Sequence, residues 1–274
     1  MRILLNKNFI RIFMLCLLVL SCGLPDVTSI YLEMNQPFIT KVISGDNKIT
    51  IEFEAQNNEP AFSGYNIYFG DNVNPQKYRI YNSQKARPTI SAGATDTPTK
   101  HTYTVESGCY YSEGSGEILT LTTPSSQLQN GIPVYVYVSA YQITPQNESY
   151  YYYDNYVQMA CPRSETLGAS ISLGNITSGG RTLATLSGTA GNLTFQNTTG
   201  GIQPRSANSL NDITFAPTTG YNTGEQTVNE NTLYLVKVVD GGSSYYGKIF
   251  VRSVSGTSAT VDYCIQSGAD ITNY

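Results

Sequence analysis

The chain has 274 residues, with 16 Lys and Arg against 20 Asp and Glu, which gives a net charge of −4 at pH 7. This acidic balance argues against nucleic acid as a partner, because phosphate backbones are bound by clustered cations. Tyrosine is abundant, with 22 residues, and tryptophan is absent. The length allows one large domain or two ordinary ones.

Residues 1–21 have the order of a signal peptide. Arg2, Lys7 and Arg11 precede the unbroken apolar run 12–20, and Ser21 and Cys22 follow it. The run is too short for a transmembrane helix, which needs about 20 apolar residues. Removing residues 1–21 takes away three cations and no anion, and this changes the net charge to −7.

The segment Val19-Leu20-Ser21-Cys22 resembles the lipobox of bacterial lipoproteins. The resemblance implies that Cys22 carries lipid, including palmitate, and becomes the first residue of the mature protein. The lipid would then hold the chain to the membrane. Gly23 follows Cys22 where some lipoproteins have Asp, and this implies localisation to the outer membrane. An ordinary secretory signal with an incidental cysteine is the alternative interpretation.

Residues 22–36 are expected to form a tether, after which hydrophobicity alternates with period two. In 48–55 the apolar residues Ile49, Ile51, Phe53 and Ala55 alternate with polar ones, which predicts a half-buried strand. The segments 62–69 and 134–140 repeat the pattern. No helical period persists, so the sequence predicts an all-β fold.

These three segments resemble strands B, C and F of the fibronectin type III (Fn3) fold, an immunoglobulin-like β-sandwich. We place this Fn3-like sandwich at residues 37–161. Val134 stands where the family usually has the tyrosine of its tyrosine corner, and the strand B tryptophan is missing. The domain is longer than usual, which implies an insertion at 82–116 with a hairpin around 112–116.

Residues 162–168 lack periodicity and contain Pro, Ser and Gly, which predicts a linker. We expect a second antiparallel β-domain at 169–274. The early strand candidates are 169–173, 182–186, 192–196 and 212–215. The segments 232–239, 245–254 and 258–266 are typical of a three-stranded meander.

The segment Leu235–Val251 resembles the C-terminal part of HmuY-like lipoproteins, with a strand, an Asp-Gly turn and a Tyr-x-Lys strand. The resemblance to HmuY-like proteins implies a bound haem whose iron is held by two histidines. The second domain has no histidine, so no haem or other cofactor is expected there.

His101 is the one histidine of the chain and lies in the polar segment Thr-Lys-His-Thr-Tyr-Thr, so we expect it to face solvent at a strand edge. Catalytic triads need a base beside a nucleophile, and no nucleophile motif accompanies His101. No spacing of Cys and His predicts a zinc site. We therefore expect neither catalytic residues nor a metal. The N-glycosylation patterns at Asn147, Asn175, Asn192 and Asn197 are coincidental in a bacterial lipoprotein.

Three cysteines, Cys109, Cys161 and Cys264, remain beyond Cys22 in the mature chain. An odd number allows at most one internal disulfide. Cys109 and Cys161 are the candidate pair because both lie in the first domain. Three buried thiols are the alternative.

Tyr150, Tyr151, Tyr152, Tyr153 and Tyr156 form the candidate ligand-binding segment. Strand alternation would place Tyr150 and Tyr152 on one face and Tyr151 and Tyr153 on the other. One pair can then be exposed, where tyrosine rings suit recognition of a host or envelope protein or a glycan. The alternative is that these rings fill the sandwich core in place of tryptophan.

Together these features predict a non-catalytic outer-membrane lipoprotein that works in binding or adhesion. One rival hypothesis is a structural or assembly component of the envelope that docks another envelope protein. A second rival is a carbohydrate-active enzyme, since Fn3-like modules accompany such enzymes.

Overall fold

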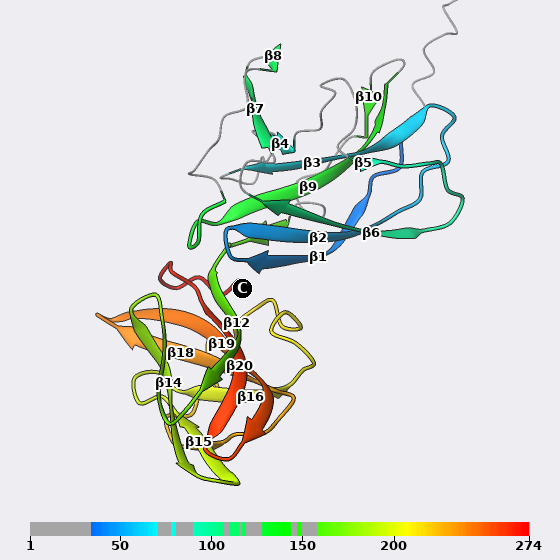
Figure 1. The fold of residues 1–274 in the computed structure, drawn as a ribbon. Helices are drawn as coiled ribbons and strands as arrows, with labels where there is room; N and C mark the ends of the chain where they lie inside the picture. The colour runs from blue at the N-terminus through cyan, green and yellow to red at the C-terminus, as the bar shows by residue number, and fades with distance from the viewer. Residues whose placement is uncertain are drawn as a thin grey trace, which may run out of the picture. The chain divides into compact units, whose positions relative to one another are not determined.

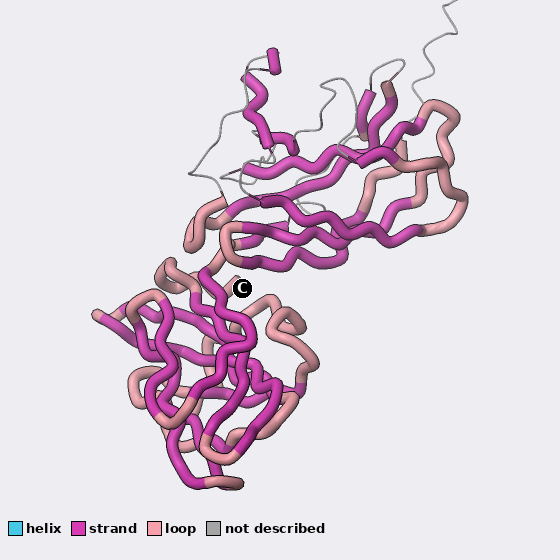
Figure 2. Tube along the Cα trace, in the orientation of Figure 1, coloured by secondary structure: helices cyan, strands magenta, loops and turns pink. Residues whose placement is uncertain are grey.

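A computed structural model describes residues 34–70, 78–80, 90–106, 110–114, 117–118, 128–143, 147–149 and 158–273. These residues form strands and loops and contain no helix (Figures 1 and 2). The all-β fold expected from the alternating pattern is therefore confirmed. Within the same residues there is no helix that could span a membrane.

The first sheet is antiparallel, in the order β1-β2-β6, and consists of β1 (Phe38–Gly45), β2 (Lys48–Ala55) and β6 (Thr99–Glu106). Every second residue of β2 is buried, as the alternation predicts. A tight turn joins β1 to β2, with Asn47 at a φ of 49°, a conformation that Asn tolerates better than most residues.

The second sheet has the order β10-β9-β3-β4-β7-β8, with β5 beside β3 and β11 beside β9. Its central strands β3 (Phe62–Gly70) and β9 (Val134–Gln142) confirm the strands predicted at 62–69 and 134–140. The other strands are β4 (Tyr78–Ile80), β5 (Ile90–Ser91), β7 (Tyr110–Gly114), β8 (Glu117–Ile118), β10 (Asn147–Glu148) and β11 (Gln158–Ala160). Antiparallel pairing of β7 with β8 confirms the hairpin around 112–116.

The two sheets share one hydrophobic core, to which both β2 and β9 contribute alternate residues. Phe53 and Tyr65 meet edge to face in it, with ring centroids 5.1 Å apart. Tyr65 is fully buried. A tyrosine thus supplies aromatic packing in a core that has no tryptophan.

The prediction that 82–116 is an insertion is wrong in part, because β6 lies within this stretch. β6 pairs with β2 over its whole length, from Lys48 opposite Glu106 to Ala55 opposite Thr99. Strand β6 is therefore part of the sandwich. Its inward positions include His101 and Tyr103, which are polar enough to hide the alternation.

The stretch 162–168, expected to be a linker, is already strand from Ser164 onward. β12 (Ser164–Ile171) begins there, and Arg163 just before it is fully buried. A register shift between Thr166 and Ala169 breaks the alternation of β12, and Gly168 has a φ of 64° there. The irregularity explains why the sequence shows no strand pattern at this point.

The C-terminal residues form a five-stranded and a four-stranded antiparallel sheet. The five-stranded sheet has the order β12-β20-β19-β18-β16, with β16 (Ile202–Ser206), β18 (Thr232–Asp240), β19 (Ser243–Ser255) and β20 (Ser258–Ile265). The four-stranded sheet has the order β13-β14-β15-β17, with β13 (Gly174–Ser178), β14 (Arg181–Thr189), β15 (Asn192–Gln196) and β17 (Gln226–Thr227). These strands confirm the predicted meander and the candidates at 182–186 and 192–196.

The prediction of a strand at 212–215 is wrong, because only an isolated β-bridge between Phe215 and Asn273 forms there. Ile213 instead packs against a cluster on the outer face of the five-stranded sheet, which includes Leu210, Leu235 and Phe250. A larger core, containing Phe195 and Tyr234, draws its residues from both sheets. The segment around Ile213 therefore covers a sheet face rather than extending a sheet.

Candidate functional site

Most residues predicted to carry function lie outside the described residues, namely Cys22, Cys109, Tyr150, Tyr151, Tyr152, Tyr153 and Tyr156. Cys161 is described, and it is a buried free thiol like Cys264. A Cys109–Cys161 disulfide is therefore not observed. Burial raises the pKa of Cys161 to about 12, so this thiol stays protonated at neutral pH.

A satisfied carboxylate lies directly before the Tyr150 segment. Glu148 on β10 accepts hydrogen bonds from Asn66 Nδ2 at 2.7 Å, Tyr68 Oη at 2.8 Å and Ser139 Oγ at 2.9 Å. The rings of Tyr68 and Tyr137 stack beside it, with centroids 4.8 Å apart and planes 5° from parallel. Both rings and the Asn66 and Ser139 side chains are buried. These contacts fix the outer face of β3 and β9, which is a structural role.

The prediction that His101 faces solvent is wrong. Its ring stacks on Phe53 and meets Tyr65, with both centroid distances 4.9 Å. The inward position opposite Phe53 in the β2–β6 pair explains this packing. Burial lowers the pKa of His101, and its buried Nε2 has no hydrogen-bond partner among the described residues. The geometry is that of a packing residue rather than a positioned general base.

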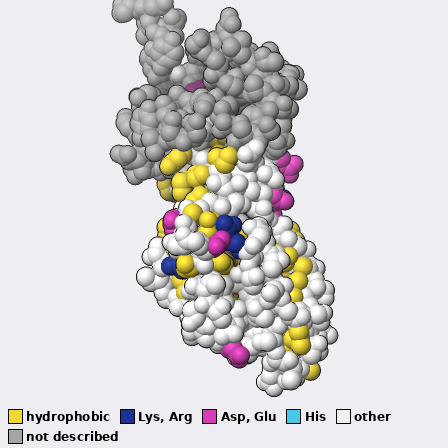
Figure 3. Space-filling model, turned by 90° about the vertical axis from the view of Figure 1, so that its left-hand side faces the viewer, with side chains coloured by type: hydrophobic (Ala, Val, Ile, Leu, Met, Phe, Trp, Pro, Cys, Tyr) yellow, Lys and Arg dark blue, Asp and Glu magenta, His cyan; other side chains and the backbone are white. Residues whose placement is uncertain are grey.

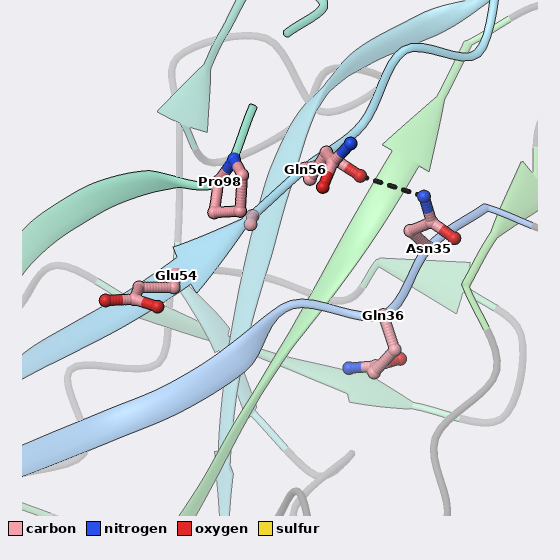
Figure 4. Close-up of a pocket in the computed structure, with 6 residues that line it drawn as sticks. Asn35, Gln36, Glu54, Gln56 and Pro98 are labelled. Carbon is pink, nitrogen blue, oxygen red and sulfur yellow. Dashed lines mark hydrogen bonds between the residues drawn. The ribbon is translucent and has the colours of Figure 1, made fainter. Parts of the chain in front are cut away.

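A shallow hollow of about 440 Å³ lies where β1 begins and β2 ends (Figure 4). It is lined by Asn35, Gln36, Glu54, Ala55, Gln56 and Pro98. Asn35 Nδ2 donates to the backbone oxygen of Gln56 at 2.9 Å, and Gln56 Nε2 donates to that of Asp96 at 2.7 Å. Glu54 Oε1 forms an ion pair with Lys100 Nζ, at a distance of 3.5 Å. The polar groups are thus largely engaged with the protein, and the hollow offers polar contacts without a reactive group.

Two buried basic side chains, Arg163 and Lys248, are a feature that sequence reasoning missed. Arg163 donates through Nη1 to the backbone oxygen of Ser44 and through Nη2 to Asn211 Oδ1 at 2.7 Å. Its Nη2 also lies 3.9 Å from Glu165. Lys248 Nζ donates to the backbone oxygen of Ile213 at 2.8 Å. No local motif marks either residue, because a lone Arg or Lys in a sequence normally reads as surface.

Desolvation by burial holds the pKa of Lys248 well below its usual range, and the nearby Arg163 charge acts in the same direction. A lysine with a lowered pKa can serve as a nucleophile where substrate reaches it. Lys248 is fully buried, and its Nζ contacts the backbone of Ile213 rather than a hollow. Among the described residues, no group of three or more His, Cys, Asp or Glu side chains could hold a metal ion.

No protein-family model matches the chain, and no curated protein matches it. Among solved structures, the chain is similar to a DUF4466 family protein from Parabacteroides merdae ATCC 43184. The two are 10% identical, with a TM-score of 0.34 over 85% of this chain and 98% of that one. A likeness this distant carries no inference about function.

Proposed function

We propose that this chain is a lipid-anchored protein of the bacterial outer membrane that works in binding or adhesion and has no catalytic activity. The observation that carries the proposal is the order of the N-terminal segments, in which cations, an apolar run and Ser21-Cys22 follow one another. Lipid on Cys22 is the anchor. The acyl chains that such processing adds exceed the two signals that stable anchoring needs.

The strand order supports kinship of residues 37–161 with Fn3-like sandwiches. In that fold a sheet of strands A, B and E packs on a sheet in which strand C lies beside strand F. Strands β1-β2-β6 and the β3–β9 pair have this order here. Val134 in place of the corner tyrosine is the departure from the family.

The hairpin of β18 and β19 supports the resemblance of the second unit to HmuY-like lipoproteins. It turns at Asp240-Gly241-Gly242, and both glycines have positive φ values, of 60° and 87°. Residues 169–274 contain no histidine, so haem is not part of the proposal.

A non-catalytic role is supported by the positions of the titratable groups described above. Glu148, His101 and Lys248 each pack or bond within the protein rather than converging on a hollow. The proposed partner is a host or envelope protein or a glycan, which an extended surface could recognise.

Protease treatment of intact cells tests the proposal against the rival role of an assembly component facing the periplasm. We expect added protease to digest the chain on intact cells while a periplasmic control protein stays whole. Protection on intact cells, with digestion only after the outer membrane is opened, would favour the assembly role instead.

A further inference from the structure

The outer face of the four-stranded sheet β13-β14-β15-β17 carries only uncharged polar side chains. The cross-strand partners fix which residues face outward, because neighbours on one face lie directly opposite each other. The outward residues are Asn175, Thr177, Thr182, Thr185, Ser187, Thr189, Asn192, Thr194, Gln196 and Thr227. All of them are exposed or half-buried.

These side chains form rows across the strands. Asn175, Thr185 and Gln196 make one row, and Ser187, Thr194 and Thr227 make the next. Thr185 Oγ1 donates to Asn175 Oδ1 at 2.8 Å, and Ser187 Oγ lies 3.0 Å from Thr194 Oγ1. Strands are spaced by about 4.8 Å and alternate residues by about 7 Å, so the groups form rows over the sheet face.

The alternation also explains two of the N-x-Thr patterns of the sequence. Asn175 and Thr177, like Asn192 and Thr194, are two residues apart in a strand and so point to the same face. The patterns arise from the array itself. They need no glycosylation to account for them.

The array differs in charge from the outer face of the β1-β2-β6 sheet. There Lys48, Glu52, Glu54, Lys100 and Glu106 accompany the threonines, and Lys100 pairs with Glu54 at 3.5 Å. Charged residues therefore occur on a comparable sheet of the same chain. Figure 3 likewise shows a described surface that is largely uncharged, with Lys, Arg, Asp and Glu gathered in small groups.

We propose that this uncharged array, over β13, β14, β15 and β17, binds an extended, uncharged polysaccharide. Each hydroxyl or amide both donates and accepts hydrogen bonds, as do the hydroxyls of a neutral sugar. Anionic polymers are bound by Lys and Arg, and protein interfaces are anchored by aromatic residues and Arg. The array contains none of these residues.

An array spread over an exposed sheet face favours a polymer over a single sugar. Small ligands are held in concave pockets that bury most of their surface, whereas a polymer can gather many weak contacts along rows. This inference deepens the proposed binding role and rests on it. It names one of the proposed partner classes and assigns it to a surface.

Sedimentation with insoluble polysaccharides tests the inference on the full chain extracted in detergent. The probes are cellulose, xylan, starch and mannan, with anionic polygalacturonate for comparison. We expect the chain to sediment with at least one uncharged probe and not with polygalacturonate.

Two variants locate the binding. Thr185→Val with Thr194→Val removes two hydroxyls while keeping the β-branched shape that strands favour, and should weaken binding about tenfold. Thr194→Lys, which places a charge in the array, should weaken it at least as much. The matched control Thr102→Lys, on the outward side of β6, should leave binding unchanged. Melting temperatures of all variants establish that they fold.

The inference is overturned if no uncharged probe retains the chain, if polygalacturonate retains it better, or if the folded array variants bind like the unchanged protein. If these polysaccharide tests fail but protease digests the chain on intact cells, the proposed binding role stands and another surface carries it. Protection from protease together with polysaccharide binding would instead overturn the proposed location and keep the array.

Discussion

Replacing Arg163 by alanine should cost a large part of the stability of the described fold. The guanidinium is fully buried and joins three partners, the backbone oxygen of Ser44, the side chain of Asn211 and the carboxylate of Glu165. Truncation leaves these groups without their donor and opens space where the side chain was. Removing one partner of a buried ion pair costs about 3–5 kcal/mol.

For a chain of this size, about 1 kcal/mol changes the melting temperature by roughly 2–4 °C. Arg163→Ala should therefore lower the melting temperature by roughly 6–20 °C. Circular dichroism during thermal and urea unfolding of the full chain measures both quantities. Arg205→Ala is the matched control, because Arg205 is exposed and makes only a 3.5 Å contact to a backbone oxygen, so its loss should change stability by under about 0.5 kcal/mol. A loss below about 1 kcal/mol for Arg163→Ala would refute the role assigned to this side chain.

Burial lowers the pKa of His101, so the folded state prefers the neutral ring. The corresponding stability is present above the unfolded pKa of about 6.5 and is lost as pH falls through the folded value. NMR titration of this one histidine should give a midpoint below that of a free peptide, and His101→Phe should remove the effect; a midpoint above it would contradict the packing. Burial raises the pKa of Tyr65 to about 12, so stability should fall as pH rises between about 10 and 12, and less so in Tyr65→Phe. Equal pH slopes in the two proteins would show that Tyr65 is not the cause. Lys248 has a lowered pKa, so the unfolded chain binds more protons and stability should rise with pH up to about 10.4. Lys248→Met should flatten that rise and change stability at pH 7 by less than about 1 kcal/mol, whereas a loss above about 3 kcal/mol would mean that the ammonium contributes net stability.

Strands with a strict alternation could be predicted from the sequence, and those with polar inward residues could not. In β2 every inward residue is apolar, and its predicted bounds agree with the structure. β6 fills its inward positions with His101, Tyr103 and Val105 beside outward threonines, so its pattern is faint. Segment 212–215 alternates but covers a sheet instead of joining one, with Phe215 58% exposed. Local periodicity does not distinguish these two outcomes.

The candidate sites depend on pairing across strands, which one sequence does not contain. The uncharged array draws rows from β13, β14, β15 and β17, and β13 and β17 were not predicted as strands. Arg163 bonds to Ser44 and Asn211, which lie 119 and 48 residues away along the chain. Partners so far away along the chain are brought to Arg163 only by the tertiary fold, so the local sequence does not show that this side chain is buried.

Lipid attachment to Cys22 is the central claim, since the proposed location and role both depend on it. Cells fed radiolabelled palmitate should label the unchanged protein, and a Cys22→Ser variant should carry no label. Label that persists on Cys22→Ser, or an unchanged protein without label, would contradict the account.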